Sequence, residues 1–220
     1  MSDDTAEIDD LVARARDAQA AYEAMGSQAL FDRACQAAAW ALMQPERNRA
    51  LADMAVAETG LGNADDKVRK NHNKTLGLMR DLKGVTSFGH IEDDAASGLS
   101  TYLRPKGVVA AIVPSTNPLA TPVNNMINAL KTGNAIILAP SPKGVKPLQT
   151  LLGHILPALR RVGVPDNLVQ MVPVPPSKPK TERLMQLADM VLVTGSQANV
   201  RAGYSSGTPA IGVGAGNVAV

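Results

Sequence analysis

The sequence predicts an α/β protein: a doubly wound parallel sheet of Rossmann-like type, preceded by a helical segment and a short hairpin. Two observations carry this prediction. From Gly107 onward, five short apolar runs alternate with helix-like segments, a pattern typical of parallel sheets with right-handed crossovers. Before residue 84, apolar residues recur at three- and four-residue steps, which is the period of a helix. The expected divisions are 1–84, helical; 85–106, a β-hairpin; and 107–220, the α/β domain.

Four helices are expected before the hairpin. The first carries apolar residues on one face: Ile8, Leu11, Val12, Ala15, Ala18 and Tyr22. Glycine ends this helix and the third one, and a proline at a first helical position opens the third. The first three expected ranges are 7–26, 28–43 and 45–60, and Asn63 or Asp65 caps a fourth helix that runs to about Leu82. Segments 84–91 and 98–107 then predict the two short strands of the hairpin.

The α/β domain is expected to contain five strands with four helices between them. The run 107–114 is continuously apolar and ends at a proline, which suits a strand buried on both faces. The other expected strands are 134–140, 167–174, 190–196 and 209–216, and the helices are 122–133, 144–163, 181–189 and 197–207. Pro157 predicts a kink or break in the second of these helices. The proline-rich segment 172–180 is interpreted as an ordered surface loop.

The composition narrows the classes of function. The net charge of +2 and the lack of basic runs interleaved with aromatic residues argue against nucleic acid as a partner. No apolar run is long enough to span a bilayer, so no membrane partner is expected. The acidic N-terminus does not suit a signal or transit peptide. These observations predict a cytoplasmic protein.

Cysteine and histidine predict neither a disulfide nor a metal site. The chain has a single cysteine, Cys35, in an alanine-rich helical run, where a small buried residue is expected rather than a nucleophile. His72, His90 and His154 stand far apart and lack the spacing of metal ligands. We therefore expect the chemistry of this chain to depend on other groups.

Three polar turns follow expected strands: PSTNP after the first, APSPKG after the second and TGSQANV after the fourth. In doubly wound sheets, ligands bind at the carboxyl ends of the strands. Small hydroxyls, glycines and backbone amides near helix starts suit a phosphate or a dinucleotide. Each turn alone is a common motif, but together on one sheet they predict a nucleotide site. Its expected residues are Pro114, Ser115, Pro140, Ser141, Lys143, Thr194, Gly195 and Ser196.

The order and spacing of these motifs resemble the aldehyde dehydrogenase superfamily. The segments VVAAIVPSTNP, ALKTGNAIILAPS, VLVTGS and IGVGAGNVAV look like its NAD(P)-binding part, and the resemblance covers the chain from about residue 8. PSTNP, TGNAII and YSSGTPAIGVGAGN are closer to the CoA-acylating branch than to the hydrolytic branch. The resemblance implies oxidation of a small aldehyde to an acyl-CoA, NAD or NADP as cofactor, CoA as co-substrate, and a homo-oligomeric parent enzyme. It also adds Gly214 to the expected cofactor site.

Two turns differ from those of the hydrolytic branch. In that branch the first turn has the sequence Pro-Trp-Asn-Phe-Pro, and its Asn donates a hydrogen bond to the developing oxyanion. Matching proline to proline places Thr116 at that Asn and Asn117 one residue later, and either side chain could donate the hydrogen bond. In the second turn, Ala139 and Pro142 replace a lysine and an acid that serve the adenosine ribose. Because that acid, which would repel a ribose 2′-phosphate, is absent and Lys143 follows Pro142, we hypothesise that NADP is tolerated or preferred.

The last segment carries the clearest departure. Hydrolytic members have Glu-Leu-Gly-Gly-Lys-Asn here, and the Glu activates water against a thioester intermediate. Matching the motif places Gly212 at the Glu position, with Gly214 and Asn217 retained. A glycine cannot act as a base, so the resemblance and the residues agree on transfer of the acyl group to a thiol such as CoA.

The nucleophile of the resembling family is a cysteine in a following domain, and Cys35 does not match it. We therefore expect this chain to be the N-terminal part of a longer enzyme and to lack dehydrogenase activity alone. The alternatives are a non-catalytic nucleotide-binding remnant and a hydrolytic semialdehyde dehydrogenase with an atypical loop. Acetaldehyde, propionaldehyde, succinate semialdehyde and sulfoacetaldehyde all fit as substrates, with a slight preference for a small anionic aldehyde.

Overall fold

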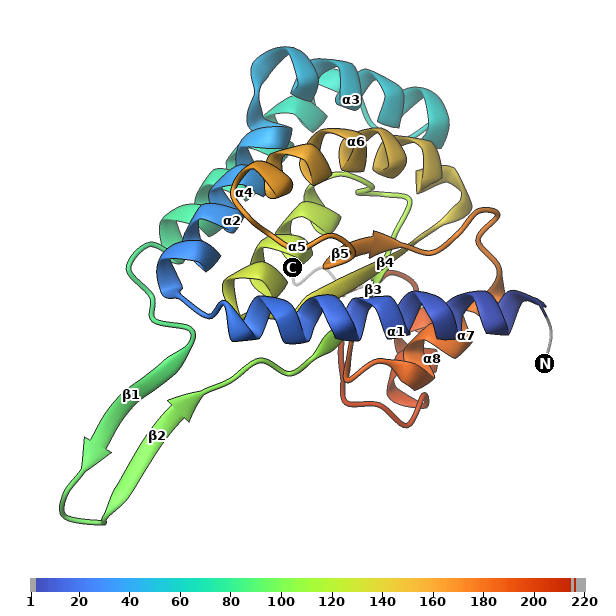
Figure 1. The fold of residues 1–220 in the computed structure, drawn as a ribbon. Helices are drawn as coiled ribbons and strands as arrows, with labels where there is room; N and C mark the ends of the chain where they lie inside the picture. The colour runs from blue at the N-terminus through green and yellow to red at the C-terminus, as the bar shows by residue number, and fades with distance from the viewer. Residues whose placement is uncertain (1–2, 215, 217–220) are drawn as a thin grey trace.

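The computed structural model describes residues 3–214 and residue 216, and it confirms the predicted α/β class. A five-stranded sheet lies between helical layers, and a two-stranded hairpin projects from the body (Figure 1). The strands are β1 (Gly89–Asp94), β2 (Leu99–Leu103), β3 (Val108–Val113), β4 (Ala135–Pro140), β5 (Val169–Met171), β6 (Met190–Thr194) and β7 (Ala210–Val213). The helices are α1 (Asp3–Ala24), α2 (Gln28–Met43), α3 (Pro45–Thr59), α4 (Ala64–Asp81), α5 (Ala120–Lys131), the 3-10 helix η1 (Pro142–Gly144), α6 (Val145–Arg161), α7 (Lys178–Leu187) and α8 (Gln197–Tyr204).

The five-stranded sheet is parallel throughout, in the order β5–β4–β3–β6–β7. The chain moves outward from the central strand β3 to β5, then returns to β6 on the other side of β3. The direction of winding therefore reverses between β3 and β6, and crevices at such a switch point, outside the carboxyl ends of the strands, are where doubly wound sheets bind ligands.

Strands β3 and β4 form the centre of the core. Every residue of both strands is buried, and they pair along their full length, from Val108 opposite Ala135 to Val113 opposite Pro140. Helix α5 packs on one face of these strands and α1 on the other (Figure 1). The continuous apolar runs in the sequence therefore mark strands buried on both faces, as predicted.

The helices form two layers. α5 and α6 lie on one side of the sheet with α2 packed against both, while α1 crosses the other side beside α7 (Figure 1). Helix α8 packs on β6 and on the edge strand β7. Side chains of a strand alternate between the two faces of the sheet, and α8 lies on the face of Gly212, so Ile211 and Val213 on the other face are exposed.

The helix that contains Pro157 differs from expectation. Helix α6 runs from Val145 to Arg161 without the break expected at the proline. Proline removes one backbone donor, which leaves the carbonyl of Gly153 without its helical partner. Both Gly153 and Pro157 are exposed, so solvent can satisfy that carbonyl and the helix continues.

The segment between β5 and α7 is also organised differently from expectation. β5 covers only Val169–Met171, shorter than the expected strand, because Asn167 adopts a positive φ of 64° and Pro173 has no amide to donate. The segment 172–180 is not a loop throughout: its last residues begin α7 at Lys178, with Ser177 as the N-cap accepting from the Lys180 amide.

The first turns of α7 are tied to α1 by two ion pairs. The Lys180 ammonium is buried and lies 2.7 Å from a carboxylate oxygen of Glu7. The Arg183 guanidinium bonds both carboxylate oxygens of Asp9, at 2.6 and 2.9 Å. This hydrogen bonding holds the pKa of the Asp9 carboxyl below its ordinary value. The N-terminal helix therefore fixes the position of α7 against the sheet.

A small polar cluster fixes the start of β3. The Asp189 carboxylate accepts from the Val108 amide at 2.8 Å and from the Arg16 guanidinium at 2.7 Å. Gly107 precedes the strand with φ of 124°, and a Cβ there would lie 2.9 Å from Cγ of Asp189. Only glycine fits this close to the Asp189 side chain. The hydrogen bonds of Asp189 connect α1, β3 and the start of β6.

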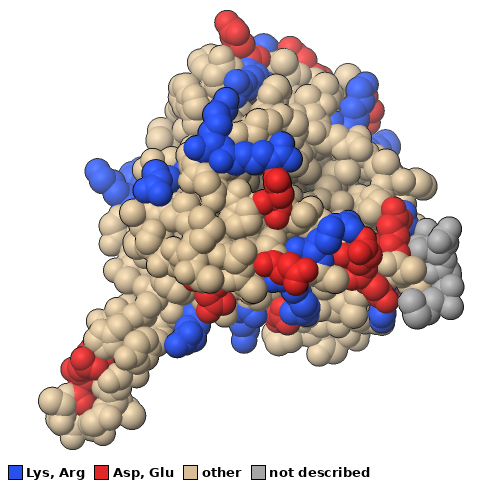
Figure 2. Space-filling view, viewed as in Figure 1, with Lys and Arg blue, Asp and Glu red and all other residues tan. Residues whose placement is uncertain are grey.

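The hairpin of β1 and β2 extends away from the body (Figure 1). Its strands pair antiparallel, from Gly89 opposite Leu103 to Asp94 opposite Leu99. Acidic side chains gather toward its tip (Figure 2), and Ile91, Leu99 and Tyr102 are exposed although they are apolar. The described part of the chain therefore leaves the hairpin largely uncovered.

Candidate functional site

A cleft of about 790 Å³ opens at the carboxyl edge of the parallel sheet. Its walls come from the ends of β3, β4, β6 and β7, from the first turn of α7 and from α8. It therefore spans the switch point between β3 and β6. Its volume lies in the range of small-molecule and cofactor sites.

Most of the residues expected at the nucleotide site line this cleft together. They are Pro114, Ser115, Thr116, Pro140, Ser141, Thr194, Gly195, Ser196 and Gly214. Two expected residues, Asn117 and Lys143, do not line it. Lys143 lies exposed on η1. The proposed roles of all these residues stay predictions, but the structure brings the three polar turns to one place.

Ten lining residues were not among the expected site residues, and five of them lie outside the strands and the turn after β4: Pro176, Ser177, Lys178, Thr181 and Asn199. The first four belong to the segment interpreted as a surface loop and to the start of α7. The signal that could have found them is the pair Ser177 and Lys180, which reads as an N-cap and the third helical residue. A helix that starts at Lys178 must bring its N-terminus to the carboxyl edge, because the next strand is parallel to the others.

The turn after β4 carries an unsatisfied hydroxyl. The Ser141 amide donates to the Val113 carbonyl at 3.0 Å, which holds the turns after β3 and β4 together. The Oγ of Ser141 is buried and has no hydrogen-bond partner among the described residues. An unpaired buried hydroxyl costs free energy, and a ligand oxygen in the cleft is the kind of group that would satisfy it.

Two helices begin at the cleft. Ser177 caps α7, and Ser196 caps α8 by accepting from the Asn199 amide at 3.3 Å. Thr194 and Gly195, which precede the α8 cap, also line the cleft. Helix N-termini present positive partial charge, so this end of the cleft suits an anionic ligand such as a diphosphate.

The charge of the cleft agrees with this preference. None of the described residues that line it carries a carboxylate, and Lys178 is the one lining residue with a full positive charge. A second, narrower hollow between α7 and α8 adjoins the cleft and shares Ile112, Lys178, Thr181 and Asn199 with it. Its remaining lining residues are Glu182, Met185 and Ala202.

The position expected to replace the hydrolytic base is closed by helix α8. A Cβ on Gly212 would lie 2.6 Å from Cγ1 of Val200 and 3.0 Å from the ring of Tyr204. The Tyr204 hydroxyl also accepts a hydrogen bond from the Gly212 amide at 3.1 Å. With α8 in this place, a side chain at residue 212 requires Val200 and Tyr204 to shift, whereas its neighbours Val213 and Gly214 line the cleft. Asn217, the retained Asn of this motif, lies outside the described residues.

The cysteine lies far from this chemistry. Cys35 is buried in α2 and its thiol donates to the Ile127 carbonyl at 3.3 Å. Burial raises the pKa of the Cys35 thiol to about 12, so it is protonated at neutral pH and is a poor nucleophile. This confirms the structural interpretation of Cys35.

Within the described ranges, no helix is both long and apolar enough to cross a membrane.

Comparison with known proteins agrees with the fold. The model of the "Aldehyde dehydrogenase family" matches residues 1–208. The acylating sulfoacetaldehyde dehydrogenase of Cupriavidus necator is 61% identical over 209 residues, which is 95% of this chain and 42% of that protein. An acetylating aldehyde dehydrogenase from Geobacillus thermoglucosidasius superposes with a TM-score of 0.91 at 35% identity, covering 98% of this chain and 47% of that one.

A propionaldehyde dehydrogenase of Rhodopseudomonas palustris, solved with bound propionyl-CoA, superposes with a TM-score of 0.83 at 32% identity over 96% of this chain and 46% of that one. The fold thus defines a doubly wound α/β protein with a cleft at the switch point. More particularly, the chain belongs to the aldehyde dehydrogenase family. It spans less than half the length of these relatives.

Proposed function

We propose that this chain supplies the cofactor-binding half of an NAD(P)-dependent, CoA-acylating aldehyde dehydrogenase. The observation that carries the proposal is the closed position at Gly212, where Val200 and Tyr204 occupy the space that a basic side chain would need. Without a base at this position, water is a poor acceptor of the acyl group, and a thiol that ionises readily, such as that of CoA, is favoured.

The residues of the cleft fit a dinucleotide. The Oγ of Ser141 has no partner among the described residues and can bind a ligand oxygen, and the N-terminus of α8 favours the diphosphate. The hollow between α7 and α8, which is lined in part by Met185 and Ala202, suits the adenine ring. A bound NAD(P) would supply the hydride acceptor for oxidation of the aldehyde. The chain's own residues bind and orient the cofactor, and the buried sheet beneath them keeps that geometry rigid.

At the reacting end of the cleft, we propose that Thr116 donates a hydrogen bond to the developing oxyanion. Thr116 lines the cleft, whereas Asn117 does not. Such a donor acts when charge grows on the carbonyl oxygen of the substrate, and its loss costs a factor of about 10² to 10³ in rate. The thiol that attacks the aldehyde lies beyond this chain in the proposed enzyme, because Cys35 is buried and protonated.

For the substrate, we propose a small anionic aldehyde, with sulfoacetaldehyde as the first candidate because the Cupriavidus necator relative is named for it. Acetaldehyde, propionaldehyde and succinate semialdehyde are the competitors to test beside it. We further propose a cytoplasmic homo-oligomer that binds neither nucleic acid nor membrane. The exposed apolar residues Leu99 and Tyr102 on the projecting hairpin support assembly with another subunit.

The proposal is tested with a chimera in which residues 1–214 of this chain precede the corresponding remainder of the Cupriavidus necator relative. Reduced cofactor is followed with sulfoacetaldehyde, with and without CoA. We expect the steady-state rate to fall at least about tenfold without CoA, and Thr116→Val to lower it at unchanged cofactor affinity. Equal rates with and without CoA would contradict the proposal, and the unaltered relative is the control for folding of the chimera.

A further inference from the structure

We infer that the cleft is adapted to an adenosine that carries a 2′-phosphate, and that Lys178 recognises this phosphate. The inference rests on the proposed function, because it assumes that a dinucleotide occupies the cleft. It goes further by naming the form of the cofactor and the residue that selects it. This residue was not expected from the sequence, in which Lys143 was the candidate cation.

The position of Lys178 places it next to the adenosine ribose. In the proposed binding mode, the base occupies the narrow hollow between α7 and α8, and the diphosphate lies in the main cleft by the N-terminus of α8. The ribose joins base to diphosphate, so it must lie where the two spaces meet. Lys178 and Thr181 line both spaces and therefore stand at this junction.

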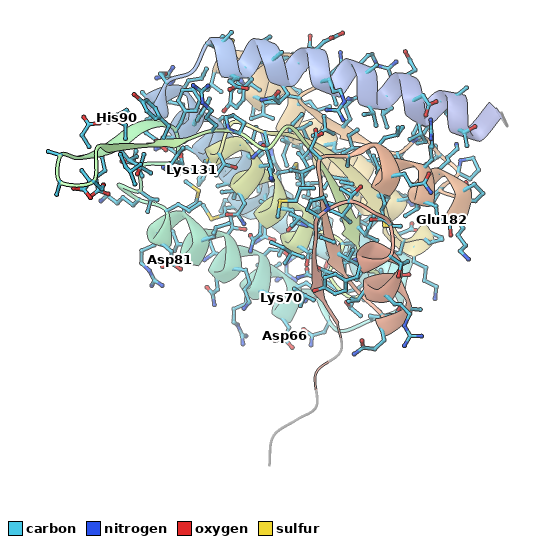
Figure 3. All side chains as sticks on the ribbon, turned by 90° about the horizontal axis from the view of Figure 1, so that it is seen from below. Asp66, Lys70, Asp81, His90, Lys131 and Glu182 are labelled. Carbon is cyan, nitrogen blue, oxygen red and sulfur yellow. The ribbon has the colours of Figure 1, made fainter. Side chains whose placement is uncertain are left out.

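The charges at the junction favour a phosphate. Sites that recognise a free 2′-hydroxyl on the ribose form a hydrogen bond to it with a carboxylate, and this carboxylate would repel a phosphate. The described lining of the main cleft holds no carboxylate, and the hollow has one, Glu182. Glu182 lies on α7, at the opposite end of the molecule from the hairpin residue His90 (Figure 3). Its carboxylate is 3.7 Å from the Lys178 ammonium.

The pair of Lys178 and Glu182 is loosely held. The side chains are 86% and 50% exposed, respectively, and exposed pairs of this kind contribute little to stability. The Lys178 ammonium can therefore leave Glu182 for a doubly charged phosphate without disturbing α7. In the absence of a phosphate, the same pairing neutralises the one carboxylate that lines the hollow.

Neighbouring groups cannot take over this role. Pro179 has no amide hydrogen, and the Lys180 amide already donates to Ser177, so the first turn of α7 offers few backbone donors. The Lys180 ammonium is buried against Glu7 at 2.7 Å. Lys143 is exposed on η1 and is not among the residues that line the cleft.

The test uses two fragments of the cofactor, 5′-AMP and adenosine 2′,5′-bisphosphate, titrated calorimetrically into the 220-residue chain. Both need only the adenosine end of the cleft, which this chain supplies. We expect the 2′-phosphorylated compound to bind at least about tenfold more tightly. Lys178→Gln should bring the two affinities within about twofold of each other. Lys143→Gln is the matched control and should keep the preference.

The outcomes are distinct. Equal binding of the two compounds to the unaltered chain, or loss of preference in Lys143→Gln instead of Lys178→Gln, overturns the inference and leaves the proposed function intact. Tighter binding of 5′-AMP that Glu182→Gln reverses means that Glu182 reads the 2′-hydroxyl, which also overturns it. Binding of neither compound contradicts the proposed function and the inference together. Thermal unfolding of each variant checks that the exposed substitutions leave the fold unchanged.

Discussion

Helix α8 fills the space next to Gly212, and the addition of one methyl group at this residue tests whether the space is closed. A Cβ would meet Val200 at 2.6 Å and the Tyr204 ring at 3.0 Å. Overpacking of this kind costs about 1–3 kcal/mol, while replacing glycine by alanine at an unstrained position gains about 0.4–1 kcal/mol through the unfolded chain. The Tyr204 residue is 60% exposed and its ring can move, but the closer contact with Val200 stays, so a cost of about 1.5–2 kcal/mol applies. We expect Gly212→Ala to destabilise the chain by about 0.5–1.5 kcal/mol.

The assay is a double-mutant cycle by thermal and denaturant unfolding. For a chain of this size, such a loss lowers the melting temperature by about 1–6 °C. In a Val200→Ala background the nearest contact is gone, so the same substitution should become neutral or stabilise by up to about 1 kcal/mol. This change of sign is the signature of a closed position. If Gly212→Ala has the same effect in both backgrounds, α8 does not fill the site of the missing base.

Three further predictions concern stability and reactivity. Gly107→Ala should cost about 2–4 kcal/mol in unfolding free energy, because the new Cβ combines an unfavourable positive φ with the contact to Asp189; a loss below about 0.5 kcal/mol would contradict the structure. The lowered pKa of Asp9 means that its bond with Arg183 stabilises the fold above the unfolded pKa and loses this effect as the pH falls. The difference in melting temperature between wild type and Asp9→Asn should therefore shrink between about pH 5 and pH 2, and a difference that grows on acidification would be inconsistent. Cys35 should react with a maleimide only at the rate of unfolding, and prompt labelling of the native chain would show that the thiol is not buried.

The central strands and the polar turns were predictable because their signals are local. β3 and β4 are continuous apolar runs bounded by proline and glycine, so their burial follows from the sequence alone. The turns after them contain small hydroxyls directly before helices, and the parallel sheet brings those turns to one edge. Sequence order thus sufficed to gather Ser115, Ser141 and Thr194 at one cleft.

The start of α7 has a local signal in its N-cap Ser177, but the position of α7 against the sheet could not be predicted, because its cause is long-range. The start of α7 is held by Lys180 and Arg183, which pair with Glu7 and Asp9 of a helix more than 170 residues earlier. Nothing local in a proline-rich segment indicates such pairing. For the same reason, Lys178 was missed as a cleft residue while Lys143, next to a recognisable turn, was expected there.

The most direct test of the central claim is hydrogen exchange of the 220-residue chain with and without saturating NADP+, read by peptide mass spectrometry. We expect NADP+ to slow amide hydrogen exchange only in the turns that contain Ser115, Ser141 and Ser196, and in the first turn of α7. The groove between α3 and α4, lined by Arg49 and His72, should exchange as it does without ligand. Protection of that groove instead of the carboxyl edge, or no protection despite measurable binding, would contradict the assignment of the cleft as the cofactor site.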